Sequence, residues 1–383
     1  MLKTLGRSAL ALCIAAGPVF AGEISEVGDF DSECTYKFTG QVEPGDAAKV
    51  KALNTFGAGG ASLCLDSPGG SLSEGIAMFD VIWNKQMHTR VIAGDRCESA
   101  CALAWLGGGV SEGTLAINFP SRSIQPGAVL GFHAPSLNLP PDNNYPAGQV
   151  EDAFGIALKA AEGLFDIKLT TQDDADALND YLYARILETP GHDMYHVDTV
   201  GEALLANVQV SAARAPETLT RANILALCEN AFLMEQGVLI DPGRAEEEMT
   251  DAASHLRYLR GRTVDGERVG YINEEVWAVR MYYYRRSGHL CLIDDETFGS
   301  YISEAKKYNR RNDLYPNGRV YQPEIWVRIE TFDFLMMEDA EETWEALEQK
   351  LASEHSQGTT RSIKVPFYAL YDAETPLRDL QAK

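Results

Sequence analysis

Short apolar runs alternate with amphipathic helical patterns along the first half of the chain. Between residues 60 and 135, apolar runs of strand length are followed by segments whose apolar positions recur every three or four residues. The predicted order is strand 61–65, helix 72–83, strand 89–93, helix 99–106 and strand 129–132. Strands that alternate with helices imply crossover connections and a parallel sheet, so we expect an α/β fold with its crevice at the carboxyl ends of the strands.

The pattern changes further along the chain. Residues 135–146 are rich in Pro and Asn and predict a loop, whereas 147–187 predicts a long helical stretch, with another short helix at 200–206. Beyond a shift of composition at 212–220, helices are predicted at 222–236 and 340–352, and aromatic strands at 277–284, 290–293, 325–329 and 363–371. We therefore predict an α/β domain over 22–212 and a smaller α+β domain of unassigned role over 215–383.

The first 21 residues have the pattern of a secretory signal peptide. Lys3 and Arg7 precede an apolar run of small residues, and Val19 and Ala21 occupy the positions that signal peptidase requires. The run is too short to span a bilayer, which needs about 20 apolar residues. A buried N-terminal helix is the alternative. We expect an exported protein, periplasmic or extracellular, with no membrane span in the mature chain.

The charge of the chain limits its partners. The 383 residues carry a formal charge of −23, and removal of residues 1–21 takes away two positive charges and leaves −25. Nucleic acids and anionic membranes recruit Lys and Arg, so neither is an expected partner.

Export also changes the interpretation of the cysteines. Six remain once Cys13 is removed with the signal peptide, and an oxidising compartment favours disulfides between them. Cys228 with Cys291 is the preferred pair. Cys97 and Cys101 form a second candidate, because Cα atoms four residues apart on a helix lie about 6 Å from each other. Buried free thiols are the alternative, and the C-x-x-x-C spacing argues against a thiol–disulfide oxidoreductase.

Three segments that follow predicted strands hold the candidate chemistry. Residues 66–71 (DSPGGS) place Gly69 and Gly70 in a turn where backbone N–H groups are open to a negative oxygen, although such turns also occur without function. Ser99 begins a helix, where it serves either as a nucleophile in the field of the helix or as a plain N-cap. His133 ends an apolar strand, where a neutral imidazole can act as a general base.

The order of these segments resembles the proteolytic subunit of the Clp protease family. The likeness rests on 65–80 (LDSPGGSLSEGIAMFD), CESAC around Ser99, GFHAP around His133, and a closing segment from Thr189 to Ala203, and it covers about residues 60–210. It implies the ClpP/crotonase fold of stacked β-β-α units. The resemblance also implies an oligomer of identical chains as a possibility, and no cofactor or metal.

The resemblance assigns roles to particular residues. Ser99 is the expected nucleophile and His133 the expected base, with an oxyanion hole formed by the N–H groups of Ala100 and of Gly70 or Gly69. The position of the family's acid falls near Met194, so Asp193 is the candidate, with Asp198 behind it. These roles imply an exported serine peptidase that acts on peptide or protein substrates without ATP.

Two alternatives stay open, and one residue departs from the family pattern. The site could be inactive, which would leave a binding or scaffold protein of the same fold. Glu98, beside the nucleophile, departs from the expected pattern, because a carboxylate there opposes a developing oxyanion unless it points away. His192 and His196 have a spacing that a metal site could use, but the sequence offers no obvious third ligand.

Overall fold

The structure is a computed structural model and describes most of the chain. The described residues are 22–29, 32–55, 60–111, 118–136, 144–172, 175–236, 263–264, 267–268, 271–273, 276–283, 287–310, 321–333 and 361–382. The predicted signal peptide, the middle of the predicted loop 135–146 and the predicted helix 340–352 lie outside them.

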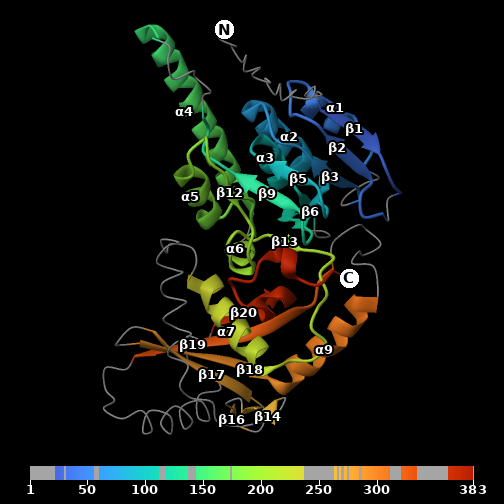
Figure 1. Cartoon of the computed structure of the whole chain (residues 1–383), viewed down its shortest axis with the longest axis vertical. Helices are drawn as coiled ribbons and strands as arrows, with labels where there is room; N and C mark the ends of the chain where they lie inside the picture. Colours follow the sequence, from blue (N-terminus) through green and yellow to red (C-terminus); the bar gives the residue numbers. More distant parts are fainter. Residues whose placement is uncertain are drawn as a thin grey trace, which may run out of the picture.

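The first half of the chain is built on a six-stranded sheet (Figure 1). Its order is β1-β2-β3-β4-β8-β13, and every pair from β2 to β13 is parallel, whereas β1 pairs antiparallel at the edge. The strands are β1 (Glu23–Glu26), β2 (Tyr36–Thr39), β3 (Ser62–Asp66), β4 (His88–Val91), β8 (Arg122–Ile124) and β13 (Gln209–Val210). The α/β class and the two predicted strands at 61–65 and 89–93 are thus confirmed.

The helices of this half largely follow the predicted pattern. They are α1 (Asp46–Ala52), α2 (Leu72–Lys85), α3 (Ala100–Leu106), α4 (Ala147–Leu169), α5 (Asp180–Glu188) and α6 (Val200–Leu205). In α2, the Ser71 side chain accepts a hydrogen bond from the Glu74 N–H and caps the first turn, and Met78, Phe79, Ile82 and Trp83 lie on the buried face. No helix in the described part of the chain has both the length and the apolar character to cross a membrane.

The long helical stretch predicted over 147–187 is two helices. A short hairpin of β10 (Thr171–Gln172) and β11 (Ala175–Asp176) separates α4 from α5. Asn179 then caps α5 by accepting a hydrogen bond from the Leu182 N–H at 2.9 Å. An Asn at this position favours the start of a new helix over the continuation of the preceding one. The apolar periodicity runs through both helices, so it did not reveal this break.

The strand predicted at 129–132 belongs to a second sheet. Its order is β12-β9-β5, with β5 (Arg96–Glu98), β9 (Val129–Phe132) and β12 (Tyr195–His196). Strands β5 and β9 are parallel, and β9 and β12 are antiparallel. Gly94, with φ of +87°, turns the chain between β4 and β5. Because β5 leaves the main sheet at that turn, β9 pairs with it there and not beside β4. The short hairpin of β6 (Gly109–Ser111) and β7 (Asn118–Pro120) lies between α3 and β8.

The second half contains a five-stranded antiparallel sheet (Figure 1). Its strands in order are β16 (Tyr271–Asn273), β17 (Val276–Tyr283), β18 (Ser287–Asp294), β19 (Glu324–Asp333) and β20 (Arg361–Pro366), and the short hairpin β14 (Thr263–Val264) and β15 (Glu267–Arg268) precedes them. Helix α7 (Arg221–Gln236) is the one predicted at 222–236, whereas α9 (Asp295–Arg310) is additional. The strand predicted at 363–371 ends at Pro366 and gives way to a 3₁₀ turn, η2 (Phe367–Leu370), and a second one, η3 (Leu377–Asp379), follows.

The end of the chain returns to the first half. The Leu377 N–H donates to the Asp198 carbonyl at 2.7 Å, and the Tyr368 hydroxyl donates to the Val208 carbonyl at 2.7 Å. Ala382 also pairs with Ala213 in an antiparallel bridge. The apolar core therefore continues from the six-stranded sheet into the C-terminal sheet.

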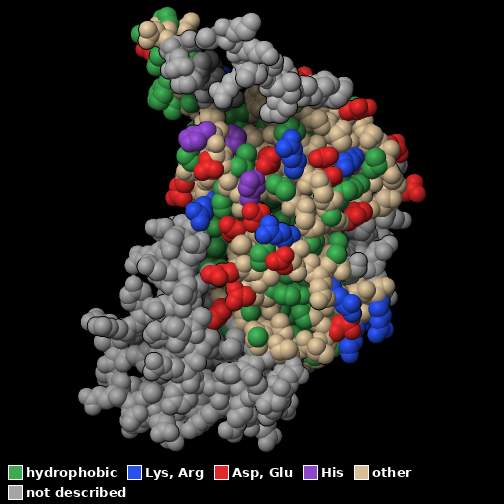
Figure 2. All heavy atoms as spheres, in the orientation of Figure 1, with side chains coloured by type: hydrophobic (Ala, Val, Ile, Leu, Met, Phe, Trp, Pro, Cys, Tyr) green, Lys and Arg blue, Asp and Glu red, His purple; other side chains and the backbone are tan. Residues whose placement is uncertain are grey.

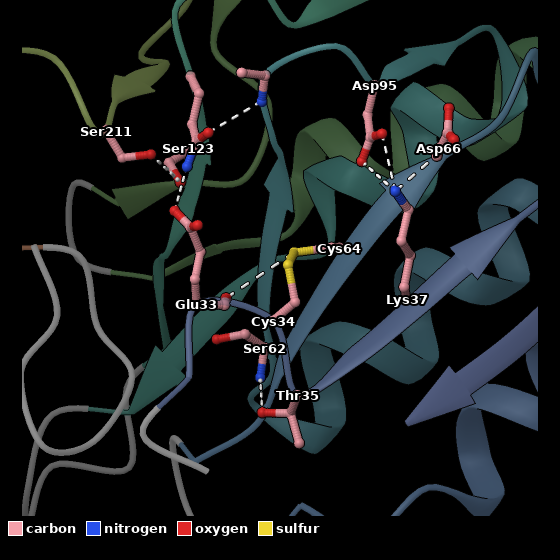
Figure 3. Close-up of a disulfide and its surroundings, with 12 residues drawn as sticks. Glu33, Cys34, Thr35, Lys37, Ser62, Cys64, Asp66, Asp95, Ser123 and Ser211 are labelled. Atoms are coloured by element: carbon pink, nitrogen blue, oxygen red, sulfur yellow. Dashed lines mark hydrogen bonds and ion pairs between the residues drawn. A yellow bond between two sulfur atoms is a disulfide. The ribbon is translucent and has the colours of Figure 1, made fainter. Parts of the chain in front are cut away.

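Two disulfides stabilise the first half. Cys34 is bonded to Cys64 on β3, and Cys97 is bonded to Cys101. Figure 3 shows the first of these bonds beside the main sheet. Cys228 is disulfide-bonded as well, and the side chain of its expected partner, Cys291, lies outside the described residues. These bonds are consistent with an oxidising compartment.

Removal of each disulfide should destabilise the fold according to the loop that it closes. The pairs are 30 and 4 residues apart, so loop closure predicts losses of about 4 kcal/mol for Cys34→Ala/Cys64→Ala and about 2 kcal/mol for Cys97→Ala/Cys101→Ala. Urea denaturation of the oxidised proteins measures both losses. An equal loss in the two variants would contradict this account.

Helix α7 and the returning C-terminal segment meet at a partly buried carboxyl group. The Asn230 side chain donates to the carbonyls of Ala369 and Tyr371, at 2.9 and 2.7 Å, and holds the two segments together. Burial and the neighbouring Asp372 raise the pKa of Glu229, on the same helix, to about 7. The carboxyl ionises more readily in the unfolded chain, so this residue lowers stability as pH rises from about 4.5 to 7.

Glu229→Gln should therefore stabilise the protein, and more so at pH 8 than at pH 5. With the partial exposure of the group taken into account, the expected gain at pH 8 is about 1 to 2 kcal/mol. Urea unfolding at the two pH values tests this, with Glu374→Gln as a control for the change in net charge, because Glu374 is exposed on the same C-terminal segment. If Glu229→Gln raised the stability equally at both pH values, ionisation of Glu229 would not be the cause of the gain.

Candidate active site

Ser99 lies at a sharp turn between β5 and α3. Its φ of 56° and ψ of −123° fall in a region that residues with side chains rarely adopt. The Ser99 N–H donates to the Gly131 carbonyl on β9 at 2.9 Å, which holds the turn against the small sheet. The hydroxyl makes no capping bond to α3, so the helix-cap interpretation does not explain this serine.

Helix α3, which Ser99 precedes, is fixed on every side. All seven of its residues are buried. Thr89 donates its hydroxyl to the Trp105 carbonyl at 2.6 Å, and the Trp105 indole N–H donates to the Ser123 carbonyl at 3.3 Å. The buried Arg122 guanidinium donates to the Leu106 carbonyl at the end of the helix. A helix held in this way gives the serine a defined position.

The structure brings Ser99 and His133 together. The Ser99 Oγ lies 2.7 Å from Nε2 of His133, which follows the last residue of β9. On the other side of the ring, Nδ1 lies 2.7 Å from the Ala134 carbonyl oxygen. A carbonyl oxygen only accepts, so Nδ1 carries the hydrogen and Nε2 is left to accept the serine proton. The imidazole is therefore held in the tautomer that a general base needs.

The structure does not bring the candidate acids to His133. The Asp193 carboxylate accepts a hydrogen bond from the Met194 N–H at 2.9 Å in an exposed turn, and Asp198 is exposed where its carbonyl holds Leu377. Within the described residues, no carboxylate hydrogen-bonds to the imidazole. A backbone carbonyl, that of Ala134, contacts the imidazole where the third member was expected, and the structure shows a Ser99–His133 pair.

The glycine turn lies directly against Ser99. A Cβ on Gly69 would come within 2.7 Å of the Ser99 Cβ and 3.2 Å of the Ala100 N. The Gly69 N–H already donates to the Ser67 hydroxyl at 3.1 Å. The N–H groups of Gly70 and Ala100, by contrast, have no acceptor among the described residues. Of the three predicted donors, these two are the ones without an internal acceptor, and Gly69 permits the close approach of the turn to Ser99.

The Cys97–Cys101 disulfide brackets Ser99. Both cysteines are fully buried, and the ring that they close contains Glu98, Ser99 and Ala100. The bond joins the last strand residues before the turn to the first turn of α3. It therefore restricts the conformations open to Ser99 and to the Ala100 N–H.

His196, which the sequence singled out only as a possible metal ligand, lies beside the site in contact with Glu98. Its Nε2 lies 2.9 Å from the Glu98 carboxylate, which is also 3.7 Å from the Arg96 guanidinium. Figure 2 shows histidine side chains gathered on one face of the molecule, in the region of β9 and β12. The described residues hold no group of three or more ligands that could bind a metal ion, so the metal alternative for His192 and His196 has no further support.

Strand β12, which carries His196, is anchored on its other face. The Tyr195 hydroxyl lies 3.2 Å from the Tyr181 hydroxyl on α5, and the Arg185 guanidinium lies over both rings. Burial raises the pKa of Tyr195 well above its usual value, so the phenol stays neutral. This cluster fixes β12 against β9 and thereby fixes His196.

Comparison with known proteins does not assign the chain to a family. Neither the scan against protein-family models nor the search of curated proteins finds a match for the chain.

Gly69→Ala should displace Ser99. The new methyl group collides with the Ser99 Cβ, and φ of +94° is itself strained for alanine, so we expect a loss of about 2 to 3 kcal/mol in stability and slower reaction of Ser99 with a fluorophosphonate. Gly127→Ala is the matched control, because its φ is +84° but a Cβ there meets nothing within 4 Å. If the two variants react equally fast, the turn does not position Ser99.

Proposed function

We propose that this chain is an exported serine hydrolase that cleaves peptide or protein substrates through an acyl-enzyme at Ser99, without ATP. The observation that carries the proposal is the 2.7 Å contact between the Ser99 Oγ and His133 Nε2, in an imidazole whose other nitrogen is held by a carbonyl. The strained turn at Ser99 and the two open N–H groups beside it add to the support.

The chemistry follows from these groups. The Ser99 Oγ attacks the substrate carbonyl carbon while His133 Nε2 takes its proton, which leaves a tetrahedral oxyanion. The N–H groups of Gly70 and Ala100 hold that oxygen, each worth about 3 kcal/mol. His133 then gives its proton to the leaving amine, and an ester remains on Ser99. Water, deprotonated by His133, attacks this ester and releases the acid product and the free serine.

The same evidence supports membership of the ClpP/crotonase superfamily as part of the proposal. Each of the three motif segments follows a strand, and two of these strands, β5 and β9, are parallel neighbours that bring Ser99 and His133 to one end of the small sheet. The bridge between Ser67 and Cys97 ties the glycine turn to the same place. Export is supported by the disulfides and by the predicted signal peptide.

The dyad has a consequence for rate. A carboxylate behind the imidazole is worth about four decades of turnover in serine proteases, because it orients the ring and stabilises its charged form. The Ala134 carbonyl orients His133 but carries no full charge. We therefore expect a slow hydrolase, with activated esters cleaved faster than peptides.

Ser99→Ala should abolish both hydrolysis and labelling by a fluorophosphonate probe. His133→Ala should lower the labelling rate by at least a hundredfold, since the serine loses its base. Ser73→Ala and His192→Ala are the matched controls, because both side chains are exposed outside the site. Rates of ester and casein hydrolysis, with labelling followed by mass spectrometry, are the measurements.

The outcome also decides between the two functions. Labelling of Ser99 that requires His133 supports the hydrolase. A folded wild-type protein whose Ser99 remains unlabelled would favour the non-catalytic alternative, in which the same crevice binds a partner.

A further inference from the structure

Glu98 and His196 form a bridge over the middle strand of the small sheet. Glu98 on β5 and His196 on β12 both pair with Gly131 on β9, one from each side. Gly131 has no side chain, and a Cβ there would lie 2.9 Å from the His196 ring and 2.7 Å from the Met194 side chain. The two side chains can meet across two strand spacings only because this position is a glycine.

The bridge lies beside the reacting groups. Glu98 directly precedes Ser99, and its strand partner Gly131 is two residues before His133. The side chains of Glu98 and His196 are 18% and 33% exposed, which places the bridge between the interior and solvent. Charges in such a position act on their neighbours more strongly than charges in bulk water.

Glu98 presents an electrostatic problem at this place. Hydrolysis creates an alkoxide or oxyanion at Ser99, and a carboxylate one residue away repels it. Among the described residues, the cationic groups that face the Glu98 carboxylate are His196 at 2.9 Å and Arg96 at 3.7 Å, and the Arg96 side chain is 55% exposed and so more strongly screened. The imidazole is thus the nearer and better shielded partner.

We propose that His196 is a positioning residue that compensates the charge of Glu98 and so permits negative charge to form at Ser99. The His196 Nε2–H donates to the Glu98 carboxylate and holds it over Gly131. This role rests on the proposed hydrolase function and adds a residue to it that touches neither the substrate nor the imidazole of His133.

A purely mechanical role for the bridge gives different expectations. If the pair only held β5 and β12 together, loss of either member would have the same effect, and loss of both would be no better than loss of one. If the pair compensates charge, only the loss of His196 is harmful, because it leaves the carboxylate behind. Removal of that carboxylate in addition should restore the rate.

A double-mutant cycle on the full chain makes this test. His196→Ala should lower kcat for an activated ester, and the labelling rate of Ser99, by about tenfold with KM little changed. Glu98→Gln should keep or raise the wild-type rate, and Glu98→Gln/His196→Ala should recover it. His196→Lys, which returns a cation, should also recover most of kcat. His192→Ala, an exposed histidine on the same segment, serves as the control.

Urea midpoints of all variants separate misfolding from loss of rate. A double variant as slow as His196→Ala, with normal stability, would overturn charge compensation, and so would a wild-type rate in His196→Ala. Both results leave the hydrolase proposal intact as long as wild-type Ser99 is labelled. If wild-type Ser99 is not labelled at all, the hydrolase proposal and this inference fail together.

Discussion

The site depends on a single residue held in a conformation that its own side chain disfavours. Ser99 adopts a positive φ, which costs of order 1 to 3 kcal/mol and persists only where the surroundings impose it. Those surroundings are a hydrogen bond to β9, the glycine turn against its Cβ, the disulfide around it and the buried helix behind it. Each constraint comes from a different element, so together they determine the direction of the hydroxyl.

The turn also explains why the serine meets an imidazole and does not cap its helix. An ordinary N-cap has extended backbone and turns its oxygen toward the first turn of the helix. The Ser99 backbone departs from this extended N-cap conformation, and its hydroxyl lies next to His133 at the end of β9. The backbone strain is thus what exposes the hydroxyl, and the Ala134 carbonyl completes the arrangement by fixing the imidazole.

Charge around the site is arranged in local pairs although the chain is strongly acidic. Figure 3 shows Lys37 on β2 directed between Asp95 and Asp66, which lie just before β5 and at the end of β3. The Lys37 Nζ is 2.8 Å from Asp95 and 3.9 Å from Asp66. This cation joins the two loops that lead into Ser99 and the glycine turn, and His196 and Arg96 form ion pairs with Glu98. The net charge of −23 therefore says little about the field at Ser99.

The sequence by itself determined the α/β class and most helices and strands, because periodicity and turn chemistry are local. The order of three motifs and their resemblance to a known family named Ser99, His133 and the glycine turn as candidates. The sequence did not determine that 129–132 joins a second sheet, that 147–187 divides at Asn179, or that the chain end returns to β13, since these depend on pairing between distant segments. Tertiary structure alone decided that Asp193 faces solvent, that a carbonyl orients His133, and that His196 reaches Glu98 across Gly131. The register of β5, β9 and β12 sets the contact between His196 and Glu98. Register pairs residues about a hundred positions apart, so no local sequence pattern predicts the contact.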